Sequence, residues 1–250
     1  MRRKPKLLFL SIFLLFIFTT CGIDELFFLP PVTHISVSGG TDIIITLPNI
    51  STITYYYATN FTIYYRIYLS DVSVDGSILE TQYSTLNPQL ETDFNDFNRT
   101  FINPTNVQVP TVSSFTNRSY YRLRTNNASV LSLIPPASTP RDIQINFTAG
   151  ESATITDLYA SATPIALLRN NSISPIPDYY FQYSSELATY GDNTGPSKTY
   201  NNDVINNVTA SGLKSYECAY VSMYIVTEGI QNNFQALYSR PKHIGVFRLL

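Results

Sequence analysis

The chain has 250 residues, of which 16 are Lys or Arg and 18 are Asp or Glu, so its formal net charge at neutral pH is −2. This mildly acidic balance without a basic tract argues against nucleic-acid binding, because contacts to phosphates supply most of that affinity. Charged residues make up only 14% of the chain and 19 residues are tyrosine, a composition that suits β-sheets whose outer faces meet water without charge.

The first 22 residues have the order of an export signal. Basic residues lie within residues 2–6, an apolar run covers residues 7–18, and small residues flank Cys21. That order predicts a signal peptide rather than part of the fold. As a helix the apolar run would rise about 18 Å, which is too short for a hydrocarbon core of about 30 Å.

The stretch from Phe18 to Gly22 (FTTCG) resembles a bacterial lipobox, although that family usually has Leu in place of Phe18 and a small residue in place of Thr20. The resemblance implies removal of residues 1–20, a diacylglycerol on the thiol of Cys21, and acylation of its new amine by a fatty acid such as palmitate. Such chains would anchor the protein permanently in a lipid bilayer. Gly22 would direct it to the outer membrane, on the periplasmic or the surface face. The alternative is an ordinary secretory signal, but no small-x-small cleavage site follows in residues 22–28.

Removal of residues 1–20 takes away four basic residues and leaves 12 Lys and Arg against 18 Asp and Glu, so the mature chain has a formal charge of −6. Cys218 is then the only unmodified cysteine, no intramolecular disulfide can form, and stability must come from burial. We expect residues 21–33 to be the lipidated cysteine and a tether that Pro30 and Pro31 stiffen.

Alternation of apolar and polar residues predicts strands over 34–38, 42–47 and 61–70. In the last of these, the odd-numbered residues share one face, and the even-numbered residues, including Tyr64 and Tyr68, point outward.

Residues 84–102 break the alternation. Leu90, Phe94 and Phe97 recur at helical spacing there, so we expect one short inserted helix that caps a sheet edge or end. Strands are predicted to resume at 106–109, 120–124 and 130–134. The Pro-rich stretch 134–140 has the composition of a linker, and we place a domain boundary there.

The second half repeats the pattern of short strands. In the longest predicted strand, Tyr220 and Tyr224 share a face with Cys218 and Ser222. Pro241 interrupts the last strand, which should therefore lie at a sheet edge. The predicted strands of this half cover residues 142–147, 153–159, 165–169, 179–184, 203–209, 216–227 and 237–249.

Residues 213–221, together with the Tyr-Ser-Arg-Pro of residues 238–241, resemble the last two strands of fibronectin type III sandwiches. The resemblance implies an all-β, immunoglobulin- or fibronectin type III-like fold, with two sandwiches in tandem over 34–135 and 140–250. One interrupted sandwich over 34–250 is the alternative. The whole chain also resembles uncharacterised lipoproteins of spirochaetes, through its lipobox, residues 29–31 (LPP), residues 61–71 and residues 238–249. That resemblance implies no known activity.

No catalytic, cofactor-binding or metal-binding residues are predicted. His34 and His243 are the only histidines, and the sequence has neither an HExxH motif nor a GxSxG elbow. Residues 71–82 imitate a calcium loop, but Gln82 stands where a bidentate carboxylate is needed, so an Asp-Gly turn is the preferred interpretation.

Four tyrosines, Tyr64, Tyr68, Tyr220 and Tyr224, are candidates for a ligand-facing aromatic platform. The alternative is that tyrosine simply suits half-buried strands. The functional hypothesis is a non-enzymatic binding or adhesion lipoprotein of the bacterial envelope, with a protein or glycan ligand. The alternative is a structural or accessory subunit of an envelope complex, in which a sheet edge pairs with a partner strand.

Overall fold

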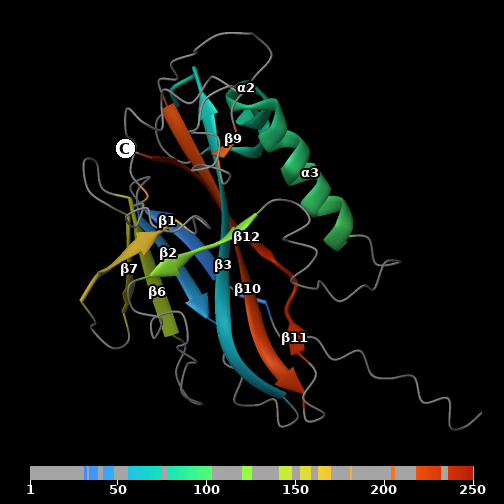
Figure 1. The fold of residues 1–250 in the computed structure, drawn as a ribbon, viewed down its shortest axis with the longest axis vertical. Helices are drawn as coiled ribbons and strands as arrows, with labels where there is room; N and C mark the ends of the chain where they lie inside the picture. The colour runs from blue at the N-terminus through green and yellow to red at the C-terminus, as the bar shows by residue number, and fades with distance from the viewer. Residues whose placement is uncertain are drawn as a thin grey trace, which may run out of the picture.

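The computed structural model contains two β-sheets and a layer of helices (Figure 1). In Figure 1 the first sheet lies on the left, the second sheet runs through the centre, and α2 and α3 lie on the right. The structure describes residues 31–32, 34–38, 42–47, 56–74, 78–102, 120–125, 141–147, 153–158, 163–169, 181, 204–205, 218–231 and 236–249.

The first sheet is antiparallel, with the described strands in the order β1-β2-β6-β7-β8-β5. Apolar and polar residues alternate in its strands, and the side chains of Ile43, Ile45, Ile143 and Ile145 are fully buried on one face. The strands are β1 (His34–Ser38), β2 (Asp42–Leu47), β5 (Arg124–Thr125), β6 (Arg141–Asn146), β7 (Thr154–Asp157) and β8 (Ile165–Leu168).

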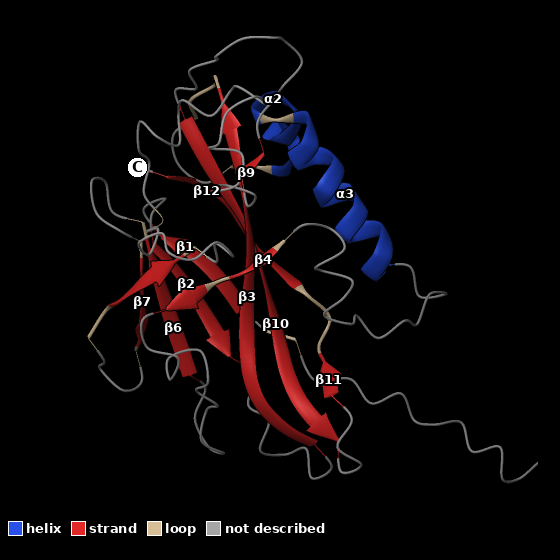
Figure 2. Cartoon of the chain, in the orientation of Figure 1, coloured by secondary structure: helices blue, strands red, loops and turns tan. Residues whose placement is uncertain are grey.

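The second sheet is built on the two longest described strands, β3 (Tyr56–Ser70) and β10 (Cys218–Gln231), which pair antiparallel over their lengths (Figure 2). Beyond β10 lie β11 (Ala236–Tyr238) and β12 (Lys242–Leu249). Beyond β3 lie β4 (Tyr121–Arg122), which is antiparallel to it, and β9 (Val204–Ile205), which is parallel. Among the described strands, β11 and β12 pair only with β10, so the chain around Pro241 lies at a sheet edge as predicted.

The main core fills the space between the two sheets. It joins the isoleucines of the first sheet to Ile63, Tyr65 and Ile67 of β3 and to apolar side chains of β10 and β12. This packing gives the chain the two-layer arrangement of a β-sandwich. The all-β prediction is therefore confirmed at the level of two packed, mostly antiparallel sheets.

One buried ion pair lies within the first sheet. The guanidinium of Arg141 donates to both carboxylate oxygens of Asp157, and the side chain of Asp157 has no solvent exposure. Each ion offsets the desolvation cost of the other, so removing one partner would leave an uncompensated buried charge.

The helical layer covers the outer face of the second sheet. It consists of η1 (Glu80–Gln82), α2 (Tyr83–Leu86) and α3 (Pro88–Ile102). The Asn87 side chain accepts a hydrogen bond from the backbone N–H of Gln89 at 2.9 Å, which caps the start of α3, and donates to the carbonyl of Leu69 on β3 at 3.2 Å. A second buried cluster joins this layer to the sheet and contains Tyr68, Ile78, Tyr83, Leu86, Leu90, Phe94, Cys218, Tyr220 and Val246.

The helix predicted over 84–102 is confirmed, but its expected place on a sheet edge or end is wrong. The helix lies across the sheet face because Leu90 and Phe94 bury against side chains of that face. Spacing shows which helix residues are apolar but not which surface they meet.

Strands from both sides of residues 135–140 contribute to each sheet. β2 pairs with β6 in the first sheet, and β3 pairs with β10 in the second. This pairing is not that of two separate sandwiches over 34–135 and 140–250. Residues far apart in the chain instead share each sheet and one core.

Most predicted strands that fall on described residues are present. The strand predicted over 120–124 is instead two short strands, β4 and β5, which lie in different sheets. Of the strand predicted over 179–184, the structure describes only Phe181, which lies in a bend. Residues 106–109 and 130–134, and the Pro-rich stretch 134–140, also lie outside it.

Candidate functional site

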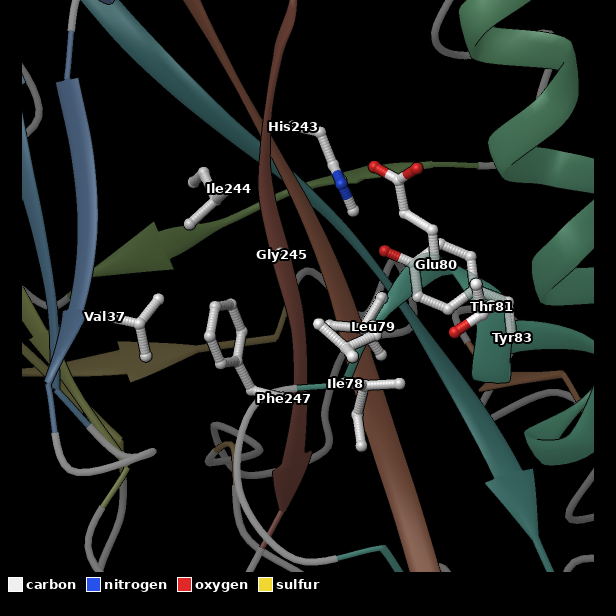
Figure 3. Close-up of a pocket in the computed structure, with 11 residues that line it drawn as sticks. Val37, Ile78, Leu79, Glu80, Thr81, Tyr83, His243, Ile244, Gly245 and Phe247 are labelled. Atoms are coloured by element: carbon white, nitrogen blue, oxygen red, sulfur yellow. The ribbon is translucent and has the colours of Figure 1, made fainter.

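An open cleft of about 490 Å³ lies along β12, which is an edge strand of the second sheet among the described strands (Figure 3). Figure 3 shows Val37 on one side of β12, and Leu79, Glu80 and Tyr83 on the other. Thus β1 and the segment before α2 form opposite walls, and β12 forms the floor. The lining residues are Val37, Ile78, Leu79, Glu80, Thr81, Tyr83, His243, Ile244, Gly245, Val246 and Phe247.

The floor of the cleft requires a glycine. Gly245 has φ of +148°, a conformation that side chains of L-residues rarely adopt. A Cβ atom added at this position would lie 2.5 Å from Cζ of Phe247, because the ring of Phe247 covers the Gly245 backbone. The pairing of β12 with β10 also shifts register between Met223 and Tyr224, which leaves Ile244 as the extra residue of a bulge.

Both walls present apolar side chains to solvent. Leu79 is 63% exposed and Val37 is 40% exposed, and both line the cleft. Gln82 holds the Leu79 turn, since its side-chain oxygen accepts the Leu79 N–H at 3.2 Å while its own N–H donates to the Leu79 carbonyl at 2.9 Å. Exposed apolar side chains gathered around a concave surface are typical of a binding site.

His243 closes the polar end of the cleft with a partly buried ring. Its ring centroid lies 4.6 Å from that of Tyr224, 5.2 Å from that of Phe94 and 6.2 Å from that of Tyr83. Burial, with a smaller contribution from the nearby charge of Lys242, lowers the pKa of His243 to about 3. The imidazole is therefore neutral at physiological pH.

A chain of hydrogen bonds runs from His243 under the helical layer. Nε2 of His243 lies 3.4 Å from Oγ of Ser222, and the hydroxyl of Tyr120 donates to this Oγ at 3.5 Å. The hydroxyls of Tyr120 and Tyr68 lie 3.2 Å apart, and Tyr68 donates to a carboxylate oxygen of Asp93 on α3 at 2.5 Å. Burial raises the pKa of Tyr120 to about 12 and also raises the pKa of Tyr68, so both phenols stay protonated.

The contact between Ser222 and His243 does not present a nucleophile to the cleft. Ser222 is 1% exposed, and its distance to the imidazole is long for a hydrogen bond between a nucleophile and its base. The chain of hydrogen bonds instead ties α3 to the second sheet and satisfies polar groups that the helix covers.

The expected aromatic platform is not on the surface. Tyr64, Tyr68, Tyr220 and Tyr224 are at most 3% exposed, so the expectation that they face outward to a ligand is wrong. The even-numbered face of β3 and the matching face of β10 are covered, which period-two alternation cannot distinguish from a solvated face. Tyr220, for example, donates to the carbonyl of Val72 and accepts the N–H of Val74, both at 2.8 Å.

The remaining positions considered in the sequence are Cys21, the two histidines and the imitation of a calcium loop. Cys21 and the side chain of His34 lie outside the described residues. In the imitation of a calcium loop, the Gln82 side chain is used by the Leu79 turn. Among the described residues, no three His, Cys, Asp or Glu side chains are grouped to hold a metal ion. Neither α2 nor α3 of the described part combines the length and apolarity of a membrane span.

Sequence reasoning did not identify the cleft. Its walls come from segments around residues 37 and 79, and its floor comes from β12, so no local motif contains it. The available signals were Leu79, an apolar residue outside any predicted element, and Gly245 two places before Phe247 in an otherwise regular strand pattern. The chain matches no protein-family model, no curated protein and no solved structure.

Proposed function

We propose that the chain is a lipid-anchored, non-enzymatic binding protein of a bacterial envelope, and that the cleft along β12 is its binding site. The observation that carries the proposal is the cleft itself, about 490 Å³ in volume, with exposed apolar side chains on both walls. Exposing Leu79 and Val37 to water costs free energy that a ligand would recover on binding.

The first residues support the anchoring part of the proposal. They combine a basic head, an apolar run and a lipobox-like Cys21. Val32 is buried against the sandwich core, and it follows Cys21 by 11 residues. At no more than about 3.6 Å per residue, this stretch would keep the sandwich within roughly 40 Å of the lipid surface. A fibronectin type III-like relationship of the sandwich is part of the same proposal.

A photocrosslinking experiment in native envelopes tests the proposal. Leu79 is replaced by a photoreactive phenylalanine analogue, and the matched control carries the same group at Leu158, which is 41% exposed and does not line the cleft. We expect a specific adduct from position 79 and none from position 158. The same probe in a Cys21→Ser background should lose its membrane association. Equal labelling at both positions, or an unmodified Cys21 thiol in the mature protein, would contradict the proposal.

A second candidate is an accessory subunit of an envelope complex. The observation that favours it is that the floor of the cleft is an edge strand, which can pair with a strand of another protein. The identity of the photoadduct separates the two candidates: a subunit of an envelope complex should give the same single protein adduct in every envelope preparation, whereas the adduct of a binding protein should increase with the amount of its ligand.

A further inference from the structure

The lining of the cleft limits the chemistry of its ligand. Among the described residues that line it, polar side-chain groups belong to Glu80, Thr81, Tyr83 and His243 alone. The other lining residues are apolar, and a cleft of about 490 Å³ with such a lining has the size and character of a small-molecule site. A ligand rich in hydroxyl groups, such as a glycan, would leave many of them without partners there, which costs free energy. The cleft therefore suits a ligand with an apolar body and few polar groups.

His243 and Tyr83 do not attract an anion to this site. Nε2 of His243 lies 3.4 Å from Oγ of Ser222, and burial lowers the pKa of the imidazole to about 3, so the ring is neutral at physiological pH. The phenol of Tyr83 also stays neutral, because burial and then the nearby charge of Glu80 raise its pKa. Neither side chain offers a positive charge to a ligand.

Glu80 gives the cleft a negative charge. It is the one charged side chain among the described lining residues, and it is exposed to solvent. Figure 3 shows it on the same side of β12 as Tyr83, and its effect on the pKa of Tyr83 shows that its field acts on this wall. Lys242 of β12 does not line the cleft, and the chain has more acidic than basic residues. This field favours a cation and disfavours an anion.

We propose that the cleft binds a small organic cation with an apolar body, which packs between Leu79 and Val37 and places its ammonium group beside Glu80. This inference rests on the proposed binding role of the cleft and adds the chemical class of its ligand. Such a ligand leaves the backbone of β12 as it is. The N–H of Ile78 keeps its bond to the carbonyl of Val246, so both walls stay in place when the ligand binds.

Three small probes with the same apolar body test the charge preference. They are para-fluorophenylpropylamine, the corresponding alcohol and the corresponding carboxylate. Fluorine NMR relaxation measures their binding to the full mature chain in phosphatidylcholine nanodiscs, and empty nanodiscs correct for partition into lipid. We expect the amine to bind at least about threefold more tightly than the alcohol, and the carboxylate to bind most weakly. Equal binding of the amine and the carboxylate, or no binding of the amine up to about 10 mM, would overturn the inference.

A charge variant places the ammonium group. Glu80→Gln should weaken binding of the amine about twofold to fivefold and leave binding of the alcohol unchanged, because only the amine is charged. The matched control is Glu91→Gln, which changes an exposed residue of α3 outside the cleft and should alter neither probe. Equal losses for the amine and the alcohol in Glu80→Gln would show that Glu80 does not select charge, and would overturn the inference.

An apolar variant places the body of the ligand. Leu79→Ala should weaken binding of the amine and of the alcohol alike, about threefold or more, because both lose the same apolar contact. Leu158→Ala, which removes an exposed leucine outside the cleft, should change neither. Equal effects of the two variants would place the probes outside the cleft and reject the site.

The crosslinking and probe experiments can fail separately. A protein or glycan adduct at position 79, with no binding of the amine, would reject the ligand class and leave the binding role intact. An adduct of low mass at position 79 that the amine competes away would support both proposals. No adduct at position 79 and no binding of the amine would reject both.

Discussion

His243 shows how the surroundings of one side chain set its chemistry. Aromatic rings of Tyr83, Phe94 and Tyr224 lie around its imidazole, and Ser222 is its hydrogen-bond partner. This environment disfavours the imidazolium, and the positive charge of Lys242 adds to the effect. The low pKa of His243 therefore makes folding sensitive to acid.

Replacing His243 by Phe should reduce the loss of stability in acid. Above about pH 6.5 the imidazole is neutral in both the folded and the unfolded chain, so it adds no pH dependence. Between this pH and the folded pKa of about 3, the unfolded chain binds a proton that the folded chain does not, and stability falls as pH falls. From pH 7 to pH 5 the wild type should lose up to about 2 kcal/mol more than His243→Phe.

Urea unfolding followed by circular dichroism at several pH values measures this difference. The carboxylates titrate in both proteins, so their contributions cancel in the comparison. Identical pH profiles for the two proteins would show that His243 is protonated as easily in the folded chain as in the unfolded one.

At the scale of elements, the helical layer determines which side chains of the second sheet are exposed to solvent. Without α2 and α3 the even-numbered face of β3 would offer tyrosines to solvent, as the sequence suggested. With the helices in place, Tyr68 donates to Asp93 of α3 and packs with Leu90 in the second buried cluster. The helices therefore bury this face, and exposed apolar side chains remain instead at Leu79 and Val37, which line the cleft beside β12.

Replacing Leu90 by Ala should loosen the layer of helices. Leu90 is fully buried, and truncation of such a side chain costs about 2–5 kcal/mol. Cys218 lies under the same layer, and in a Cys21→Ser background it is the single thiol of the chain. We therefore expect its reaction with a disulfide reagent in native buffer to accelerate at least about tenfold, because opening of the layer becomes more frequent.

The matched control is Glu91→Ala, which changes a neighbouring exposed residue of α3. This variant should react at the wild-type rate. An unchanged rate in Leu90→Ala would mean that α3 does not control access to Cys218.

At the scale of the whole molecule, the sheets are interleaved rather than consecutive. In the second half of the chain, β10 pairs with β3 from the first half, and β6 pairs with β2 from the first half. Much of the pairing between described strands therefore joins residues far apart in the sequence, and the described core residues come from both halves of the chain. Such a topology makes folding depend on the entire chain, as contacts at large sequence separation generally do.

Fragment 140–250 should not fold by itself. It lacks β2 and β3, so β6 and β10 would each expose an apolar edge and an apolar face. We expect no cooperative urea transition for this fragment, whereas fragment 21–250 should show one. Coexpression of 21–139 with 140–250 should restore the transition if the halves complement each other. A cooperative transition in 140–250 alone would instead support two independent sandwiches.

The sequence alone predicted those secondary-structure elements that a local pattern of residues determines. Period-two alternation identified β2, β3, β6, β7 and β10 because side chains of a strand alternate between faces whatever the strand pairs with. The spacing of Leu90 and Phe94 identified α3 because apolar residues four apart share one face of a helix. Pro241 predicted that the last strand lies at an edge because proline cannot donate a backbone hydrogen bond within a sheet. The lipobox-like first residues still stand as a prediction about anchoring.

Only the tertiary structure decided which strands share a sheet, which tyrosines are buried and where an apolar surface remains exposed. These properties depend on contacts between segments that are far apart in the chain, and alternation is the same for a face covered by a helix as for one covered by water. The cleft needs Val37, Leu79 and Gly245 together, and no single stretch of sequence contains all three. The sequence by itself therefore determined the elements, and long-range packing determined the site.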